Sequence, residues 1–391
     1  MKRILLITHD ASRTGAPMVV LHFARWLREH RPAVAVDVLA VKGGELAAEF
    51  RSAADTYWEL NVAPPQRGLA VRAIRKGMRM VGLLRAPSAA EVRDRILQEI
   101  AAHNYDAVLA NSLASIPLAV QLKALAGGGV LLIAHIHELE MVIRQVLPDL
   151  PVHLAEVDRV WAGSELVKDG LLNTWGVPPD RVEVQYPSAV VKQAETIVPV
   201  ERPSGLHVVG LGSVVLRKGY DLFIQVAAWV RRHHPELEVH FTWGGPVTVY
   251  DRPLIDHDIT NAGLSGHVRF IGAQSDPAPL YASTDVFLLP SREDPFPLVC
   301  IEVGAMGKPI ICFEGATGTA EVLRHGGGRI VPYLDIEAMG QAVVDYALDA
   351  ARRKADGDLN RAQFAKFGPE QQCPLMLQRI DEALKRKAAQ A

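Results

Sequence analysis

Three acidic residues in the carboxyl-terminal half are candidates for binding a ligand that carries hydroxyl groups. Seven residues separate Asp294 from Glu302, and Glu293 directly precedes the first of them. An ionised carboxylate accepts two hydrogen bonds from a vicinal diol, so each acid can fix the orientation of such a ligand as well as add affinity. The alternative is that Asp294 is a surface acid in a loop and Glu302 an acid on a helix face.

A turn that could hold a phosphate group precedes these acids. Residues 212–219 follow a short apolar run and lead into an amphipathic pattern, and they include Arg217 and Lys218. A helix amino terminus presents free backbone N–H groups and a positive potential, which together with a cation favour a phosphate. We expect Lys218 to face the ligand, and Arg217 either to point elsewhere or to act as a second cation. The alternative is a solvated surface lysine.

In the amino-terminal half, two histidines follow an apolar run. Residues 130–134 lead into His135-Ile136-His137-Glu138. A neutral imidazole, with an ordinary pKa near ~6.5, can hydrogen-bond a sugar hydroxyl or stabilise a developing charge. A core histidine with satisfied hydrogen bonds is the alternative reading for both residues.

The loop at residues 13–17 is a further candidate. It follows the first apolar run and contains Gly15 and Pro17. Glycine permits close approach of the backbone to a ligand, and proline suits the first turn of a helix. An ordinary helix start would use the same residues, so the pattern fits both a ligand loop and a plain turn.

Familiar nucleotide and metal motifs are absent or weak. Residues 210–215 lack the third glycine of the dinucleotide-binding pattern, and the sequence has no Walker phosphate loop. The tripeptides at 256–258 and 356–358 match Asp-x-Asp, but neither follows an apolar run, so we interpret them as solvated loop carboxylates. His135 and His137 have no third metal ligand at a recognisable spacing. The sequence therefore predicts a site that needs no metal ion and no resident cofactor.

Short apolar runs alternate with amphipathic segments along the whole chain. We expect strands at 4–7, 35–41, 107–110, 130–134 and 159–162, then at 207–211, 238–241, 268–271, 286–289 and 309–312. Amphipathic helices are expected between them, at 16–31, 114–126, 165–175 and 222–233. Continuous apolar runs are typical of parallel strands covered on both faces, and the alternation predicts an α/β protein with doubly wound parallel sheets.

A proline-containing segment, residues 186–205, divides the chain into halves of similar size. We therefore expect two Rossmann-like domains, at 1–188 and 206–370. A final helix at 371–391 could pack on either domain, including back on the first one. The carboxyl ends of both sheets would then surround one cleft, which is where such folds bind ligands.

Composition excludes several classes of protein. The 391 residues carry 42 Lys and Arg against 44 Asp and Glu, a net charge of -2, which argues against a dedicated nucleic-acid binder. Three scattered cysteines fit neither a disulfide framework nor a zinc site and indicate a reducing compartment. The apolar run at 4–7 is too short for a signal peptide, and no stretch reaches the ~20 apolar residues of a membrane span. These features predict a cytoplasmic protein.

One region departs from this charge balance. No acidic residue lies between Glu59 and Glu91, whereas six cations do: Arg67, Arg72, Arg75, Lys76, Arg79 and Arg85. Apolar residues recur beside them at helical spacing. Such a basic amphipathic helix can lie on an anionic membrane, so residues 67–85 predict peripheral attachment at the inner face of the membrane. An ordinary helix with a solvated cationic face is the alternative.

Taken together, these motifs resemble the retaining glycosyltransferases of family four, which have the GT-B fold. The resemblance rests on residues 14–17, 137–138, 163–168, 212–219, 270–272, 287–291, 294–302 and 305–311. It implies that Asp294, Glu293, Phe296 and His137 contact the donor sugar and that Glu302 binds ribose hydroxyls. The implied nucleotide and phosphate contacts are Gly15, Ser213, Arg217, Lys218, Gly272, Ala273, Pro297 and Leu298. The implied catalytic residues are His137, Asp294 and Lys218.

The sequence departs from the family pattern at three places. The first acid is Asp294 where the family usually has glutamate, so Glu293 could reach the sugar instead. Ser213 or Gly212 stands where an arginine is usual. Residues 315–321 occupy the place of a Gly-Gly-x-Pro-Glu loop but lack the proline.

The resemblance implies a function. A sugar would pass, with retention, from a nucleoside diphosphate sugar bound by the second domain to a hydroxyl acceptor bound by the first. The acceptor would be a glycan or lipid-linked glycan of cell-surface polysaccharide synthesis, and domain closure over the linker would exclude water. The alternatives are a GT-B nucleotide-sugar epimerase and a non-catalytic sugar-nucleotide-binding subunit.

Overall fold

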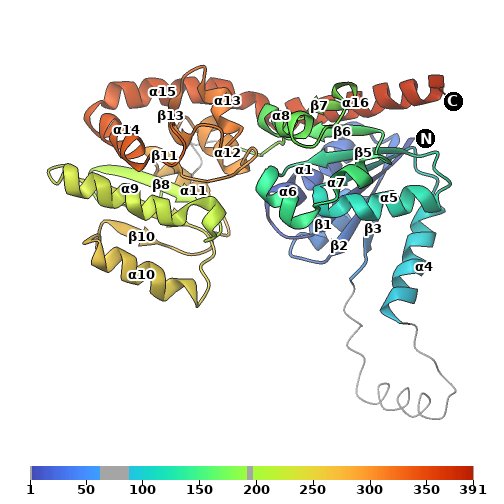
Figure 1. The fold of residues 1–391 in the computed structure, drawn as a ribbon, viewed down its shortest axis with the longest axis horizontal. Coiled ribbons are helices and arrows are strands. Elements are labelled where there is room, and N and C mark those ends of the chain that lie inside the picture. The colour runs from blue at the N-terminus through green and yellow to red at the C-terminus, as the bar shows by residue number, and fades with distance from the viewer. Residues whose placement is uncertain (1, 62–87, 192–196, 391) are drawn as a thin grey trace, which may run out of the picture.

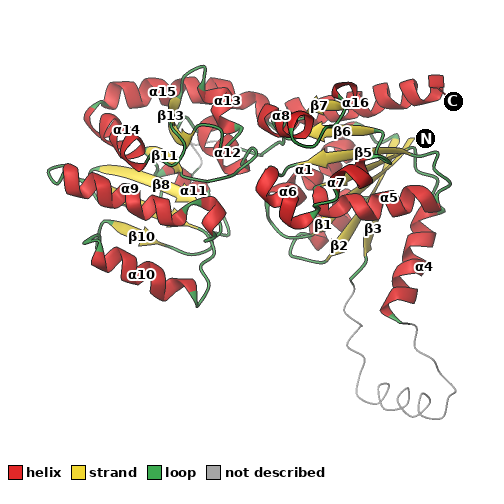
Figure 2. Ribbon diagram, in the orientation of Figure 1, coloured by secondary structure: helices red, strands yellow, loops and turns green. Residues whose placement is uncertain are grey.

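The computed structural model describes residues 2–61, 88–191 and 197–390, and these form two α/β domains side by side (Figures 1 and 2). Each domain is built on one parallel sheet, with seven strands in the first and six in the second. The predicted fold class is therefore confirmed. The termini of the chain both lie at the outer end of the amino-terminal domain (Figure 1).

The amino-terminal sheet has the strand order β3-β2-β1-β4-β5-β6-β7. Its strands are β1 Lys2–Asp10, β2 Val34–Lys42, β3 Thr56–Glu59, β4 Ala107–Asn111, β5 Leu131–Ile136, β6 Arg159–Ala162 and β7 Val182–Val184. The chain moves outward from β1 to β3 and then returns to the other side of β1 with β4. The strand order thus reverses between β1 and β4, the position at which open α/β sheets bind ligands.

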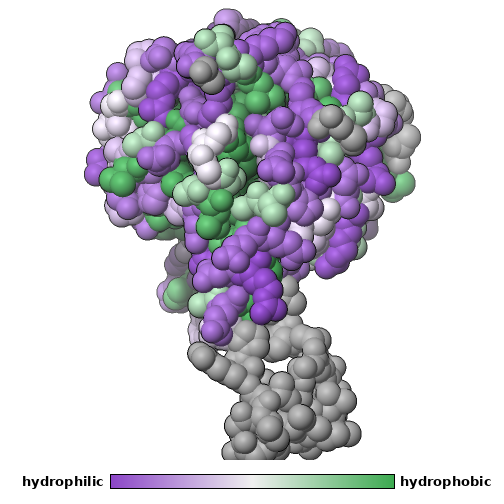
Figure 3. Space-filling model, turned by 90° about the vertical axis from the view of Figure 1, so that its right-hand side faces the viewer, coloured by the Kyte–Doolittle hydropathy of each residue, from purple (hydrophilic) through white to green (hydrophobic). Residues whose placement is uncertain are grey.

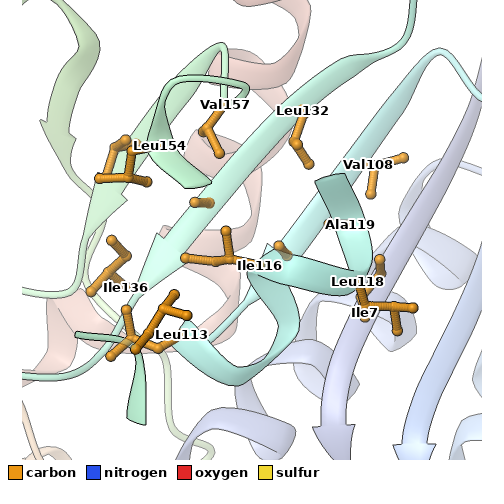
Figure 4. Packing of buried hydrophobic residues seen from close by; sticks show 14 of the residues in the cluster. Ile7, Val108, Leu113, Ile116, Leu118, Ala119, Leu132, Ile136, Leu154 and Val157 are labelled. Carbon is orange, nitrogen blue, oxygen red and sulfur yellow. The ribbon is translucent and has the colours of Figure 1, made fainter. Parts of the chain in front are cut away.

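Helices cover both faces of this sheet. They are α1 Gly15–His30, α2 Ala47–Ala53, α4 Ala89–Ala101, α5 Ile116–Leu125, α6 Glu140–Val146, α7 Leu150–Leu154 and α8 Glu165–Asn173. Alternate residues of β1 enter different clusters: Leu5 and Ile7 pack on the α5 side, and Ile4 and Leu6 on the α1 side. Figure 4 shows part of the first cluster. Burial on both faces explains why these strands read as continuous apolar runs.

The carboxyl-terminal sheet has the order β10-β9-β8-β11-β12-β13. Its strands are β8 Leu206–Leu211, β9 Val239–Gly244, β10 Val268–Phe270, β11 Val286–Leu289, β12 Ile310–Phe313 and β13 Gly328–Val331. Its helices are α9 Tyr220–His233, α10 Asp251–Asn261, α11 Ala278–Ala282, α12 Leu298–Ala305, α13 Thr319–Leu323, α14 Ile336–Leu348 and α15 Ala350–Phe364. Here the order reverses between β8 and β11, so each domain has its own ligand-binding position.

The last helix, α16 (Pro369–Gln390), leaves the carboxyl-terminal domain and packs on the amino-terminal one (Figure 1). Cys373, Met376 and Ile380 lie in the same apolar cluster as α1 and β1. Lys387 of this helix pairs with Asp158, at 3.0 Å, just before β6. The two domains are therefore joined twice, once by the linker and once by α16.

Two details differ from the sequence interpretation. The Asp-x-Asp tripeptides are not in loops, because residues 256–258 lie within α10 and 356–358 within α15. Asp256 pairs with Arg252 one turn away, and the hydroxyl of Tyr346 donates to Asp356. These carboxylates belong to ordinary helix surfaces. In the described ranges, no group of three or more His, Cys, Asp or Glu side chains could hold a metal ion.

The outer end of the amino-terminal domain carries apolar side chains between polar ones (Figure 3). Beneath the surface, Ile100 of α4, Leu122 of α5 and Val130 line a small apolar cavity of about 10 Å³. The basic stretch, residues 67–85, lies outside the described residues. Across the described part of the chain, no helix is long and apolar enough to cross a bilayer.

Candidate functional site

Polar residues gather at the carboxyl ends of β1, β4 and β5 in the amino-terminal domain. His9 and Asp10 end β1, Asn111 ends β4, and His137 and Glu138 follow β5. Since these three strands are neighbours in the sheet, their last residues lie at one edge. This edge faces the carboxyl-terminal domain, whose residues contact the helices that follow β5 and β6.

His137 is held in one orientation by Asn111. The Asn111 amide donates to the carbonyl of Ala16 at 2.8 Å, so its Oδ1 is free to accept the Nε2–H of His137 at 2.9 Å. This leaves Nδ1 as an acceptor. Burial, together with nearby His135 and His9, holds the pKa of His137 well below its usual range. At neutral pH His137 is therefore an uncharged imidazole with one acceptor nitrogen available.

His135 has a different role. Its side chain is fully buried, its Nε2 lies 2.9 Å from the carbonyl of Gln185, and burial lowers its pKa to about 4. It is a core histidine. Glu138 lies at the sheet edge that faces the other domain. Its carboxylate accepts a hydrogen bond from the backbone N–H of His137, and burial raises its pKa to about 7 although the positive charge of Arg217 in the other domain lowers it.

The carboxyl-terminal domain contributes the turn between β8 and α9. Gly219 has φ +73°, and a Cβ there would lie 1.9 Å from the carbonyl oxygen of Pro290, so only glycine fits this position. The close contact brings the end of β8 against the end of β11. Lys218 Nζ consequently lies 2.5 Å from Asp294 Oδ2, and Ser291 Oγ lies 3.3 Å from the same oxygen.

Arg217 also faces this position, as the second of its two alternatives, a second cation beside Lys218, requires. Its Nη1 donates to the carbonyl of Glu293 at 2.6 Å and lies 4.0 Å from Asp294 Oδ1. Residues 216–218 form a 3-10 turn that directs both cations toward the end of β11. Two positive charges therefore stand where the strand order reverses.

Glu293 reaches out of its own domain. Its Oε1 accepts the backbone N–H of Met141 at 2.8 Å, and its Oε2 that of Val142 at 3.3 Å, both at the start of α6. Glu321 does the same at α8, accepting from the N–H groups of Glu165 and Leu166. The longer of the two adjacent acids, Glu293, is thus occupied at the domain interface, whereas Asp294 stays beside Lys218.

Glu302 lies in α12, where the hydroxyl of Tyr281 donates to its Oε2 at 2.7 Å. Burial raises the pKa of Glu302 to about 7. An ionised carboxylate has about four acceptor positions, so Glu302 can accept further donors beside Tyr281. Gly272, with φ +76°, and Ala273 follow β10 at the same edge of the sheet, and nothing lies within 4 Å of the Cβ position of Gly272.

Phe296 lies among other aromatic side chains. Its side chain is buried, with its ring 5.1 Å from that of Tyr186 and 4.9 Å from that of Phe367. Packing of the Phe296 ring against these two rings, where the linker and the segment before α16 meet, stabilises the fold. The side chain of Phe296 therefore belongs to this aromatic cluster, and its contact with a donor sugar stays a prediction. Pro297 is buried as the N-cap of α12, beside the half-buried Leu298.

The two remaining predicted residues lie at the surface of the cleft edge. Gly15 is exposed at the first position of α1, where an added Cβ would meet nothing within 4 Å. Ser213 is exposed just after β8. Sequence reasoning did not single out His9 and Ser112, although the position of His9 at the end of the first apolar run was a usable signal. It placed Glu321 at the end of the 315–321 loop, but the contact of Glu321 with the other domain could not be predicted from the sequence.

Comparison with known proteins agrees with this geometry. Residues 13–189 match the family described as Glycosyltransferase Family 4, and residues 205–349 match Glycosyl transferases group 1. The two matches fall on the two domains and together span most of the chain. The protein therefore belongs to the group 1 glycosyltransferases of family four, and its architecture is the GT-B fold.

Three curated relatives match about half of the chain. They are an exopolysaccharide phosphotransferase of Streptomyces coelicolor (27% identical, 55% of this chain), a D-inositol 3-phosphate glycosyltransferase of Paenarthrobacter aurescens (25%, 58%) and a GDP-mannose-dependent mannosyltransferase of Mycolicibacterium smegmatis (29%, 48%). The matched segments span 22%, 58% and 49% of those relatives' own lengths.

Solved structures show the same fold over nearly the whole chain. The Anabaena protein HepE, in complex with UDP-glucose, aligns with a TM-score of 0.76 at 17% identity, covering 99% of this chain and 100% of that one. Sucrose-phosphate synthase of Thermosynechococcus elongatus gives a TM-score of 0.75 at 19% identity, covering 99% of this chain and 100% of that one.

Proposed function

We propose that this glycosyltransferase moves a sugar, with retention, from a nucleoside diphosphate sugar to a hydroxyl group of a glycan or lipid-linked glycan, and that it needs no metal ion. The observation that carries the proposal is the convergence of Lys218 and Arg217 on Asp294 at the strand-order reversal of the carboxyl-terminal sheet. Fixed cations at such a position suit a diphosphate.

The departure of the diphosphate explains why two cations are needed at this position. When the bond between the anomeric carbon and the phosphate oxygen breaks, negative charge develops on the diphosphate. Lys218 and Arg217 stabilise that charge because they are already in place and need no reorganisation. This is the role that a divalent metal ion plays in other transferases, and it is the basis for proposing a metal-independent reaction.

Asp294 is better suited to positioning than to nucleophilic attack. Its carboxylate is buried and already paired with Lys218. Attack by the acceptor oxygen on the face that the phosphate leaves would retain the configuration, and the acceptor's proton would pass to the departing phosphate oxygen. Neutral His137, whose Nδ1 is available as an acceptor, would hold a sugar hydroxyl from the opposite side of the cleft.

The relatives support the substrate classes. HepE is described in complex with UDP-glucose, and one mannosyltransferase is named for GDP-mannose. Other relatives are named for lipopolysaccharide core biosynthesis. A nucleotide-sugar donor and a glycan acceptor at the inner face of the membrane are the proposals that follow. Co-sedimentation with anionic vesicles, comparing wild type with a variant whose six cations in 67–85 are glutamine, tests the membrane contact.

A thermal-shift screen against UDP, GDP, dTDP and CMP, followed by the corresponding sugars, tests the donor. Binding raises the melting temperature by an amount set by ligand concentration and affinity. Transfer is then measured with and without EDTA, and the anomeric configuration of the product is read by NMR. Inversion would refute retention, and loss of activity in EDTA would refute metal independence. A nucleotide that binds and is never transferred or hydrolysed would favour a non-catalytic subunit.

A further inference from the structure

A second group of polar residues occupies the strand-order reversal of the amino-terminal sheet. His9 and Asp10 end β1, and Ser112 directly follows β4. Thr8 pairs with Asn111 across these two strands, so the residues that follow them lie side by side. The position corresponds to that of Lys218 and Asp294 in the other domain, and the donor site described above does not use it.

Ser112 has a backbone conformation that glycine normally adopts. Its φ is 81° and its ψ 156°, and the residue is 1% exposed. Any residue with a Cβ is strained there. Its N–H donates to the carbonyl of His135, which fixes the backbone, and its Oγ lies 3.0 Å from His9 Nδ1. The strained backbone thus places a hydroxyl group against the imidazole.

His9 is oriented with one edge toward solvent. Its side chain is 33% exposed, and its Nε2 lies 3.5 Å from Asp10 Oδ2. Asp10 is itself fixed, because its Oδ1 accepts the N–H and the hydroxyl of Ser12 at 3.0 and 2.7 Å. A separation of 3.5 Å exceeds an ordinary hydrogen bond. A hydroxyl oxygen beside both groups could accept the Nε2–H and donate its own proton to the carboxylate.

The pair also lies near the proposed site of transfer. Thr8, which precedes His9, pairs with Asn111, and the amide oxygen of Asn111 lies 2.9 Å from His137 Nε2. Four residues after His137, the backbone N–H of Met141 donates to Glu293, the neighbour of Asp294. A hydroxyl bound at His9 and Asp10 would face the donor from the amino-terminal domain.

We infer that His9 and Asp10 bind the hydroxyl group of the sugar acceptor and that Ser112 is a positioning residue that fixes the His9 imidazole. This rests on the proposed transferase function. Ser112 does not touch the acceptor, since it is buried, and acts through Nδ1 of His9. His9 presents Nε2 to the acceptor.

Amide substitutions distinguish the roles of the two ring nitrogens of His9. The glutamine side chain places an amide near the position of Nε2, and that of asparagine places one near Nδ1. His9→Gln should therefore keep part of the transfer activity, whereas His9→Asn and His9→Ala should raise the acceptor KM and lower kcat/KM about 10- to 100-fold. His30→Gln is the matched control, because His30 is 36% exposed on the last turn of α1, at the opposite edge of the domain.

Substitutions of Ser112 separate function from stability. Ser112→Gly removes the strain together with the hydroxyl, so it should raise the melting temperature and still lower kcat/KM for the acceptor about tenfold. Ser112→Ala loses the hydroxyl and keeps the strain. If Ser112 had a merely structural role, Ser112→Gly would also be more stable than wild type, but its kcat/KM for the acceptor would be unchanged.

The measurement uses the donor found in the thermal-shift screen and three acceptor probes: methyl α-D-mannopyranoside, methyl β-D-glucopyranoside and myo-inositol. Nucleotide affinity is measured in parallel and should be unchanged in every variant. Equal transfer by wild type and His9→Asn would overturn the inference, as would a variant that loses nucleotide binding along with transfer. If wild type cleaves the donor and glycosylates none of the probes, water serves as the acceptor probe. Equal rates of donor hydrolysis by wild type and His9→Asn would then overturn the inference. A wild type that binds no donor refutes the proposed function instead.

Discussion

The carboxylate of Glu293 accepts a hydrogen bond from the backbone N–H of Met141 at 2.8 Å, although the two residues belong to different domains. Glu321 makes the equivalent contact with the start of α8, 2.8 Å from the N–H of Leu166, and also accepts from the hydroxyl of Tyr186. Two acids of one domain thus supply the amino termini of two helices of the other with the negative charge that such helix ends favour.

These contacts predict that Glu293 and Glu321 stabilise the closed arrangement of the domains. A carboxylate at a helix amino terminus contributes about 0.5–2 kcal/mol, so each alanine substitution should lower the ratio of closed to open molecules about 2- to 30-fold. Small-angle X-ray scattering should show a larger radius of gyration for the double variant.

Glu314→Ala is the control, because Glu314 is exposed in the same domain. The nucleotide should restore the closed form in the single variants if it bridges both domains. An unchanged scattering profile for the double variant would show that these contacts do not determine closure.

We expect Lys218 to contribute strongly to the affinity for the nucleotide. Lys218→Ala should abolish the thermal shift with the nucleoside diphosphate and lower kcat/KM about 100- to 1000-fold, because a fixed cation at the leaving group is lost. The substitution also removes the nearest cation from the buried Asp294, whose remaining partners are Arg217 at 4.0 Å and the Ser291 hydroxyl at 3.3 Å, and this destabilises the fold. Lys218→Ala combined with Asp294→Asn removes the under-compensated charge, so the double variant should regain stability without regaining the nucleotide shift.

Lys385→Ala, an exposed lysine of α16, controls for the loss of one surface charge. Recovery of nucleotide binding in the Lys218 and Asp294 double variant would argue that Lys218 serves stability alone.

The strands that the sequence failed to predict are β3, β7 and β13, and all three lie at a sheet edge. An edge strand has one neighbour and is covered less completely, so it need not be a continuous apolar run. In β3 every residue is half-buried, and β7 has three residues. Central strands such as β6 and β11 were predicted with their observed bounds, because burial on both faces gives them an unambiguous pattern.

The site shows a similar division. Residues in local turns, such as Lys218 and His137, could be predicted because the turn and the neighbouring strand are read from adjacent residues. Phe296 could not, since its partners Tyr186 and Phe367 come from the linker and the crossing to α16. Ser112 could not either, because a positive φ in a residue other than glycine leaves no mark in the sequence.

Gly219 predicts a large difference between two glycine substitutions. Both Gly219 and Gly263 have positive φ, +73° and +68°, but a Cβ at Gly219 would lie 1.9 Å from a carbonyl oxygen, whereas nothing lies within 4 Å of the Cβ position of Gly263. Gly263→Ala should cost about 1 kcal/mol of unfolding free energy for the backbone conformation alone. Gly219→Ala should cost about 2–4 kcal/mol and weaken nucleotide binding, because the turn that carries Lys218 must move. Equal denaturation midpoints for the two variants would contradict the close contact of this turn with β11.

Glu302 predicts a trade-off between stability and function that depends on pH. Burial raises its pKa from 4.5 to about 7 in the folded protein. Between those pH values the folded state binds more protons than the unfolded state, so stability falls as the pH rises through this range.

Glu302→Gln removes the buried charge and can still accept from Tyr281. The variant should therefore be about 1–3 kcal/mol more stable than wild type at pH 8 and about equally stable at pH 4.5. Glu138, whose pKa is also raised to about 7, titrates in both proteins, so the difference between them isolates Glu302. Chemical denaturation across this pH range measures the stabilities. If Glu302 binds the ribose hydroxyls, as the family resemblance implies, the stabilised variant should bind the nucleotide more weakly, since a neutral amide replaces an ionised acceptor. A variant that gains stability at pH 8 and keeps wild-type nucleotide affinity would remove Glu302 from the binding site.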